Sequence, residues 1–253
     1  MTQRWPDKLW LVRHGQSAGN VARDAAHAAG ADRLGLDGRD VDVPLSDLGI
    51  AQARALGHWF AALPTAERAD ALLVSPYVRA IRTAELLRES NGVDADEPVC
   101  VDERLREKEF GILDGLTRQG VINLAPDQAR FREILGKFYH RPPGGESWCD
   151  VILRLRSLLD TIALHYAERR VIIVAHQVVV LCLRYIIEKL DEAQILAIDA
   201  AGDVANCSVT EYRFVTGRGT GEMQLDRYNF TVPLEQETVP VTSARDFPVA
   251  SRG

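Results

Sequence analysis

The 253 residues suffice for one large domain or two small ones. Hydrophobic residues make up 46% of the chain and charged residues 26%, and this composition excludes wholesale disorder. Lys and Arg number 30 and Asp and Glu number 36, so the formal net charge of −6 argues against a general nucleic-acid-binding protein. The first residues contain no apolar secretory segment, no apolar run is long enough to cross a bilayer, and the four separated cysteines form no CxxC pair. We therefore expect a cytoplasmic protein with reduced cysteines and no membrane partner.

The chain starts with an apolar run, residues 8–12, that predicts a buried strand ending just before Arg13. Residues 20–43 are rich in Ala, Asp and Gly, so we expect an inserted surface loop that is helical at most at its start. Ser46 is a suitable N-cap, and apolar side chains recur at helical spacing from there to Leu63. This pattern predicts a strand, a loop and a long helix in that order.

A second apolar run, residues 71–74, predicts a strand that leads directly into a helix. Ser75 as N-cap and Pro76 at the first helical position predict that this helix continues to about Glu89. The chain is less regular from there to the Pro-Pro-Gly-Gly break. The elements expected in this region are a short strand at 97–101, an irregular stretch at 105–120 and a helix at 127–138.

The second half of the chain carries the clearest periodicity. Its predicted elements are a helix at 147–169, an apolar strand at 171–175, a helix at 177–190 and a hairpin of two alternating strands at 208–215 and 223–230 with its loop at 216–222. From Pro233 onward the chain is rich in Pro and Thr, so residues 233–253 are expected to form an extended tail.

Alternation of strands and helices predicts an α/β fold, a three-layer α/β/α sandwich with a mainly parallel sheet. No linker divides the chain, so we interpret residues 1–253 as a single domain with insertions at about 21–43 and 116–143. Sheets of this kind bind ligands at the carboxyl ends of their strands. The polar residues that follow the predicted strands are therefore the candidates for a functional site.

Arginine and histidine follow three of these strands. Arg13 and His14 come after the first, Arg79 lies shortly after the second, and His176 follows the strand at 171–175. Two guanidinium groups and two imidazoles in one crevice suit a phosphoryl group, because arginine presents paired donors and a histidine can attack phosphorus. Each residue alone is more often structural. No third ligand stands at metal spacing, so no metal is expected.

Seven motifs stand out along the chain: LVRHGQS at 11–17, PLSDLG at 44–49, SPYVRAIRTAE at 75–85, LREKEFG at 105–111, GGES at 144–147, VIIVAH at 171–176 and Asn-Cys-Ser at 206–208. Read together, these motifs resemble those of the histidine phosphatase superfamily, the phosphoglycerate mutase-like proteins, and they occur in the family's order. The resemblance covers at least residues 9–208. The resemblance implies a phosphoglycerate mutase-like fold.

The resemblance also implies roles for individual residues. The implied catalytic residues are His14 as the phosphorylated nucleophile, Glu107 as the general acid, and Arg13, Arg79 and His176 as the clamp around the phosphoryl group. The implied or plausible phosphate and substrate contacts are Asn20, Gln177, Ser208, Arg82 and Tyr77. For Glu107 the competing carboxylates are Glu103 and Glu109. No cofactor is expected.

Several positions depart from the family's pattern and bear on the reaction. Gln16 and Gln177 stand where glutamate and glycine are common, and Gly19-Asn20 stands where true mutases have Trp-Asn. Glu109-Phe110-Gly111 replaces the mutases' His-Tyr-Gly, and residues 138–151 are closer to the broad-range phosphatase branch. These departures favour a phosphatase over a mutase.

Three functions remain open at this point. The leading hypothesis is a phosphomonoester hydrolase that acts on a small phosphorylated metabolite through phosphohistidine. The alternatives are a cofactor-dependent phosphoglycerate mutase, which needs a cap that excludes water, and a non-catalytic phospho-ligand binding module. A homodimer through the hairpin or the tail is possible but nothing in the sequence requires it.

Overall fold

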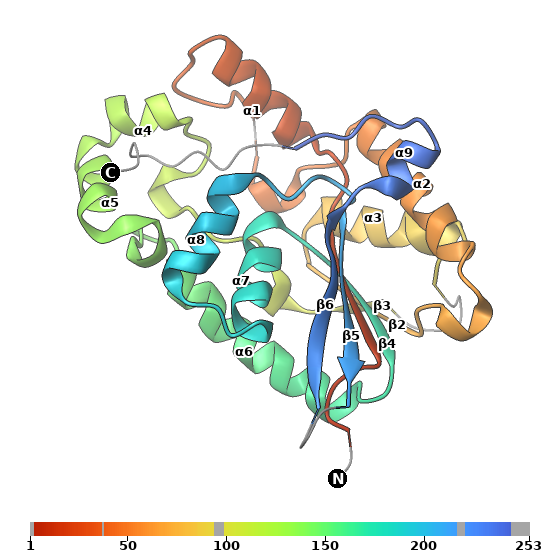
Figure 1. The fold of residues 1–253 in the computed structure, drawn as a ribbon. Coiled ribbons are helices and arrows are strands. Elements are labelled where there is room, and N and C mark those ends of the chain that lie inside the picture. The colour runs from red at the N-terminus through yellow and green to blue at the C-terminus, as the bar shows by residue number, and fades with distance from the viewer. Residues whose placement is uncertain (1–2, 37, 94–98, 217–220, 244–253) are drawn as a thin grey trace.

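The computed structural model describes residues 3–36, 38–93, 99–216 and 221–243, and its core is one six-stranded sheet with the strand order β3-β2-β4-β1-β5-β6 (Figure 1). The first four strands of that order are parallel, and a hairpin of two antiparallel strands extends the sheet beside β1. The strands are β1 (Lys8–Arg13), β2 (Ala71–Val74), β3 (Val99–Val101), β4 (Arg170–Ala175), β5 (Val209–Val215) and β6 (Glu222–Phe230). The mainly parallel sheet confirms the prediction.

Helices cover both faces of this sheet because successive strand residues point to opposite sides. Trp10 and Val12 pack against one layer of helices, whereas Leu9 and Leu11 pack against the other. The first layer contains α2 (Asp47–Ala61), α3 (Val78–Glu89) and α9 (Val232–Gln236). The second layer contains α6 (Trp148–His165), α7 (Gln177–Ile187) and α8 (Glu192–Ala201). The three-layer α/β/α sandwich is therefore confirmed.

The register of the central strands brings three polar segments to one edge. β1 and β4 pair from Lys8 with Arg170 to Arg13 with Ala175, so both strands end at the same level. The His14 N–H continues the ladder to the Ala175 carbonyl at 3.0 Å. The N–H of the residue after β2 donates to the Val174 carbonyl, also at 3.0 Å. The residues that follow β1, β2 and β4 are therefore neighbours.

The two inserted regions lie at the end of the sheet where the parallel strands finish (Figure 1). Their helices are α1 (Ala18–Ala28), α4 (Arg118–Leu124) and α5 (Pro126–Tyr139). The short 3-10 turns of the chain are η1 (Asp40–Asp42), η2 (Thr65–Glu67), η3 (Glu103–Leu105) and η4 (Gly111–Leu113). The Thr117 N–H donates to the Asp32 carbonyl at 3.0 Å, which connects the first insertion to the second.

The first half of the chain agrees with the expectation at 20–43 and differs from it in two places. Residues 20–43 start in a helix as expected, because the Ser17–Asn20 capping box starts α1 and the helix continues to Ala28. The stretch expected to be irregular, 105–120, contains the start of α4. The predicted Ser75-Pro76 helix start is wrong, since α3 begins at Val78.

The second half differs at helix ends. The helices α6 and α7 end earlier than predicted, at His165 and Ile187, and the chain then reverses through Glu168 (φ 62°) and Lys189 (φ 57°). Helix α8 was not predicted, and the tail expected to be extended starts with the short helix α9. The described residues do not include 97–98 of the third expected strand, most of the hairpin loop, or 244–253 of the tail. In the described part of the chain no helix combines the length and hydropathy needed to cross a bilayer.

Candidate active site

His14 lies in the first turn after β1 and is only 3% exposed. Its Nδ1 is 2.7 Å from the Gly15 carbonyl oxygen, which can only accept a hydrogen bond, so Nδ1 carries the proton. The Asn206 side-chain amide donates to the His14 carbonyl at 3.0 Å and fixes the backbone. Gly15 is required at the next position because a Cβ there would come within 2.5 Å of the Gly49 carbonyl oxygen. The imidazole is thus held in one tautomer.

The other ring nitrogen of His14 faces the guanidinium group of Arg79. Arg79 Nε donates to His14 Nε2 at 3.2 Å, so Nε2 keeps its lone pair. Burial, followed by the nearby charges of Arg79 and Arg13, holds the pKa of His14 well below its usual value. His14 is therefore a neutral imidazole at pH 7, and its Nε2 lone pair accepts the hydrogen bond from Arg79.

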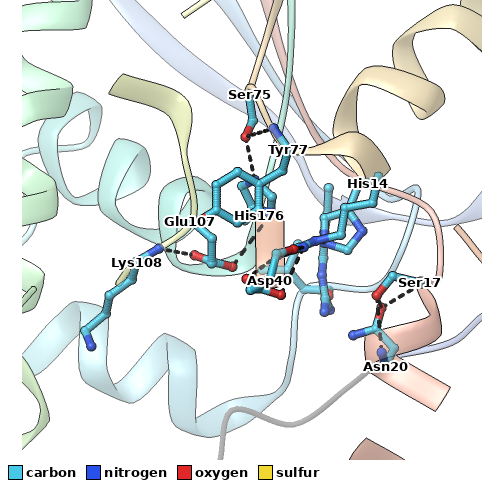
Figure 2. A network of polar contacts seen from close by, with 12 residues as sticks. His14, Ser17, Asn20, Asp40, Ser75, Tyr77, Glu107, Lys108 and His176 are labelled. Atoms are coloured by element: carbon cyan, nitrogen blue, oxygen red, sulfur yellow. Dashed lines mark hydrogen bonds and ion pairs between the residues drawn. The ribbon is translucent and has the colours of Figure 1, made fainter. Parts of the chain in front are cut away.

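His176 lies across from His14 at the start of α7 and is fully buried. The two ring centroids are 5.1 Å apart, and His176 Nε2 is 2.7 Å from Ser75 Oγ (Figure 2). Its Nδ1 has no hydrogen-bond partner among the described atoms and faces Glu107 Oε2 at 3.9 Å, which is too long for a hydrogen bond. Burial, with the charge of Arg79 next in weight, lowers the pKa of His176 well below its usual value. A neutral His176 whose Nε2 accepts from Ser75 can donate through Nδ1.

The two arginines are positioned by carbonyl oxygens and carboxylates. Arg13 is 4% exposed and donates through NH1 to the Val204 carbonyl. Arg79 lies over the Tyr77 ring at 4.7 Å and donates to both carboxylate oxygens of Asp40, at 3.1 and 2.9 Å. A third bond joins Arg79 NH1 to the Asp40 carbonyl oxygen at 2.6 Å. Asp40 thus occupies the outer edge of the guanidinium group, where a planar, paired donor set would otherwise meet a phosphate.

Glu107 follows η3 and reaches the same region from the opposite side (Figure 2). The Lys108 N–H donates to its Oε1 at 2.8 Å. Arg154 of α6 donates to the Glu107 carbonyl at 3.2 Å and to both oxygens of Glu146, at 2.9 and 3.0 Å. The Glu109 N–H also donates to Glu146, at 3.1 Å. The glutamate of the GGES motif therefore anchors the backbone directly at Glu109 and, through Arg154, at Glu107.

The charge state of Glu146 follows from these contacts. Burial opposes its ionisation, but the hydrogen bonds and charge of Arg154 outweigh burial and hold the pKa of Glu146 below its usual value. A carboxylate that stays ionised keeps both bonds to Arg154. The segment that carries Glu107 is therefore held rigidly at neutral pH.

A cavity of about 140 Å³ connects these groups. Its polar lining includes Arg13, His14, Asn20, Arg79, Glu107 and Gln177. Its apolar lining comes from the two insertions and the segment before α4, through Leu34, Leu36, Val43, Phe110, Leu113 and Leu116. Asp114 also lines the cavity, where burial, followed by the charge of Asp40, raises its pKa. Donors at the floor and apolar side chains above them suit a phosphate group bound away from water.

Asn20 presents donors to this cavity because its oxygen is already used. Asn20 Oδ1 accepts from the Ser17 N–H at 3.0 Å and from the Ser17 hydroxyl at 3.2 Å (Figure 2). It also accepts from Asn206 Nδ2 at 3.4 Å. The Asn20 NH₂ group is what remains to bind an anion. Gln177 is 2% exposed and donates to Asp203 at 3.1 Å, so its carboxamide is anchored.

The structure brings most of the predicted site residues together, but not all of them. His176 and Tyr77 are not among the residues that line the cavity; their rings pack against each other, with the centroids 4.9 Å apart. Arg82 lies away from the cavity and pairs with Glu85 and Glu89 at the surface, because it is on the outer side of α3. Ser208 is 1% exposed and is not among the residues that line the cavity. Arg82 and Ser208 are therefore not placed as substrate contacts.

Four residues with a role in this arrangement were missed by sequence reasoning. They are Asp40, Ser75, Glu146 and Asn206. Ser75 was assigned to a helix cap, whereas its hydroxyl lies against His176. Glu146 and Asn206 stand inside recognised motifs, so the motifs themselves were the available signal. Asp40 had no signal, because its contact with Arg79 spans 39 residues. In the described part of the chain no three His, Cys, Asp or Glu residues are grouped as metal ligands.

Comparison with known proteins adds an independent observation. A sequence profile described as the histidine phosphatase superfamily (branch 1) matches residues 9–229. A phosphoglycerate mutase-like protein of Arabidopsis thaliana is 34% identical over 168 residues, which is 62% of this chain and 53% of the plant protein, so the chain spans about half of that relative. A 2,3-bisphosphoglycerate-dependent phosphoglycerate mutase of Methylobacterium is 33% identical over 178 residues, covering 66% of this chain and 74% of the mutase. The solved structure of a mycobacterial glucosyl-3-phosphoglycerate phosphatase in complex with VO3 has a TM-score of 0.67 and 30% identity, covering 88% of this chain and 99% of that one.

Proposed function

The chain belongs to the histidine phosphatase superfamily, and from that premise we propose that it hydrolyses small phosphomonoesters through a phosphohistidine at His14. One observation supports this most directly. His14 is a buried neutral imidazole whose Nδ1 is tied to the Gly15 carbonyl at 2.7 Å and whose Nε2 faces Arg79 at 3.2 Å. A lone pair beside a guanidinium group is the arrangement that attack on an anionic phosphoryl group requires.

In the first step, His14 Nε2 attacks phosphorus and the bond from phosphorus to the ester oxygen breaks. The ring becomes positively charged, and the Gly15 carbonyl that accepts from Nδ1 stabilises that charge. Arg13, Arg79 and the Nδ1–H of His176 donate to the three equatorial oxygens, on which the transition state spreads its charge. Substrate must first displace the Asp40 carboxylate from Arg79.

Glu107 acts first as the proton donor and then as the proton acceptor in this mechanism. It lines the cavity beside the clamp, with Oε2 3.9 Å from His176 Nδ1. In its acid form it gives a proton to the leaving alkoxide, which departs as an alcohol. The resulting carboxylate then takes a proton from water as that water attacks the phosphohistidine. Inorganic phosphate leaves, and His14 and Glu107 return to their initial states.

Phosphoryl transfer to a second hydroxyl, as in a mutase, is the alternative. The apolar lining from both insertions favours it, because a cavity closed to water protects a phosphoenzyme. Two of the relatives named above carry mutase names. Against it stand the departures at Gly19 and at residues 109–111 from the mutase pattern.

Rapid-quench labelling tests the proposal. The protein is mixed with a ³²P-labelled phosphomonoester and quenched in alkali, where phosphohistidine survives. We expect burst labelling of the native chain and none of His14→Asn, with turnover reduced by roughly 10⁴-fold or more. Arg82→Gln is the matched control outside the cavity. Turnover of His14→Asn equal to that of the native chain would refute the mechanism, and transfer of label to an added alcohol in preference to water would favour the mutase.

A further inference from the structure

We propose that Thr242, in the segment that follows α9, is a positioning residue for His14, because its hydroxyl bridges two buried carboxamides that hold the loop carrying the nucleophile. This inference rests on the proposed function for the role of His14 as nucleophile. The bridge joins Asn206 to Gln52, and both of these side chains are fully buried. Residues 238–243 are not among those that line the reaction cavity, so Thr242 acts through its neighbours and not on the substrate.

Asn206 connects Thr242 to His14 itself. Asn206 Nδ2 donates to the His14 carbonyl at 3.0 Å. A carbonyl can only accept a hydrogen bond, so the NH₂ group must face His14 and Oδ1 must face away from it. The Thr242 hydroxyl donates to this Oδ1 at 3.1 Å, and the Thr242 carbonyl accepts from the Asn206 N–H at 2.8 Å. The orientation of the Asn206 carboxamide is therefore set by His14 at one end and by Thr242 at the other.

Gln52 of α2 connects Thr242 to the same loop from another side. Gln52 Oε1 accepts from the Gln16 N–H at 2.9 Å, so Nε2 is the end that faces away from the loop. Nε2 donates to Thr242 Oγ1 and to the Pro240 carbonyl, both at 2.9 Å. The Thr242 hydroxyl accepts from Gln52 with a lone pair, and its own proton is thus directed to Asn206.

The loop that carries His14 is held on several sides, but its own carbonyl depends on the Thr242 side. The Gly15 N–H donates to Thr83 of α3 at 3.1 Å, so α3 holds a residue that follows the nucleophile. The His14 carbonyl instead accepts from Asn206 Nδ2 at 3.0 Å and from the Cys207 N–H at 3.4 Å. The shorter of these two contacts is the one that Thr242 orients.

Only a group that both donates and accepts can complete this bridge. Gln52 presents a donor to residue 242, whereas Asn206 presents an acceptor. Valine has the shape of threonine but can do neither, so Thr242→Val would leave a buried acceptor on Asn206 unsatisfied. Gln52 would keep its bond to the Pro240 carbonyl, so the loss falls mainly on Asn206. We therefore expect this variant to loosen the His14 carbonyl while the backbone bond at residue 242 remains.

Kinetics of Thr242→Val and Thr242→Ser test the inference with p-nitrophenyl phosphate. Steady-state rates give kcat and KM, and rapid-quench labelling gives the rate at which His14 is phosphorylated. We expect Thr242→Val to lower kcat and the labelling rate about tenfold and to change KM less than about twofold, because a displaced nucleophile reacts more slowly with a substrate that still binds. Thr242→Ser keeps the hydroxyl and should restore most of the rate. The matched control is Ser243→Ala, which removes an exposed hydroxyl from the next residue and should leave the kinetics unchanged.

A spectroscopic measurement separates this inference from the proposed function. The proton on His14 Nδ1 is bonded to the Gly15 carbonyl at 2.7 Å, so its exchange with solvent, followed by ¹H–¹⁵N NMR, reports how firmly the imidazole is held. We expect exchange about tenfold faster in Thr242→Val and close to the native rate in Thr242→Ser and Ser243→Ala. This pattern supports the inference even if the chain hydrolyses no phosphomonoester.

Two outcomes would overturn the inference and leave the proposed function standing. The first is native kinetics and native exchange in Thr242→Val. The second is an equal loss in Thr242→Val and Thr242→Ser, which would mean that the hydroxyl is not the group that matters. If thermal unfolding shows that Thr242→Val does not fold, Thr242→Cys takes its place, because a thiol is a weaker donor and acceptor. A smaller loss in the same two measurements supports the inference, and no loss overturns it.

Discussion

Asp40 occupies the edge of Arg79 that the proposed mechanism assigns to phosphate, so replacing Asp40 with Asn should strengthen anion binding. Asp40 accepts three hydrogen bonds from the guanidinium group, two through its carboxylate and one through its carbonyl. Asp40→Asn removes the charge but keeps a carboxamide oxygen and the carbonyl. A phosphate dianion would then displace a neutral carboxamide oxygen, which binds Arg79 more weakly than the Asp40 carboxylate does.

The magnitude follows from burial and geometry. The Arg79 side chain is 6% exposed, but that of Asp40 is 40% exposed, so solvent screens the pair. A buried charge-assisted bond is worth about 1.5–3 kcal/mol, whereas exposed pairs give about 0.2–1 kcal/mol. We take about 1 kcal/mol for this pair, which corresponds to about fivefold tighter binding of phosphate.

Product inhibition by inorganic phosphate measures this effect, with calorimetry as a check that does not need turnover. Asp42→Asn is the matched control, because Asp42 belongs to the same η1 turn but pairs with the exposed Arg39 at 2.8 Å. We expect the inhibition constant to fall about fivefold in Asp40→Asn and to stay constant in Asp42→Asn.

Weaker phosphate binding by Asp40→Asn would refute the reasoning. It would mean that Asp40 mainly holds Arg79 in the orientation that phosphate needs. Equal shifts in both variants would instead indicate a general effect of net charge. Thermal unfolding of each variant shows whether the change is confined to the site.

Three further results are expected. Glu107→Gln should slow hydrolysis of alkyl phosphates by about 10²–10⁴-fold but slow p-nitrophenyl phosphate much less, because that leaving group needs little protonation; equal losses would contradict a proton-donor role. Ser75→Ala should lower kcat/KM about tenfold by leaving the buried Nε2 of His176 without its partner, and Ser75→Thr should rescue it; unchanged kinetics would exclude a positioning role for the hydroxyl. Burial, Arg79 and Arg13 keep the pKa of His14 below its unfolded value, so the unfolded chain binds the proton first and stability is lost as pH falls below about 6.5. Between pH 6 and 5, the free energy of unfolding measured in urea should therefore fall about 1 kcal/mol further for the native chain than for His14→Asn, and parallel profiles would contradict this charge assignment.

The layers of the fold could be predicted because their signals are local. Apolar runs mark the central strands, and the N-caps Ser46 and Ser147 each lie directly before a periodic apolar pattern. Asp191 with Gln194 forms a capping box before α8, so a readable signal for that helix was present and was not used. The ends of α6 and α7 depended on Glu168 and Lys189 adopting positive φ, which neither residue type predicts.

The site residues that follow the strands could also be predicted, but those that the insertions contribute could not. Arg13, His14 and His176 follow strands, and the register of a parallel sheet brings strand ends together whatever the loops do. Asp40 lies in an insertion whose path is set by contacts far along the chain. Arg82 carries the same guanidinium group as Arg79, and only its position on the outer side of α3 distinguishes it from that clamp residue.

The groups around the phosphate site also indicate how the insertion is coupled to binding. The Gly15 carbonyl, the Val204 carbonyl and the Ser75 hydroxyl each bind one edge of a histidine or arginine from the protein side. Asp40 differs, because it binds Arg79 on the cavity side and is carried by the first insertion. Phosphate cannot take that edge of Arg79 unless η1 moves or the Asp40 side chain turns away. In the proposed mechanism, binding of substrate at that edge of Arg79 therefore requires a change in the segment that lines the cavity above His14.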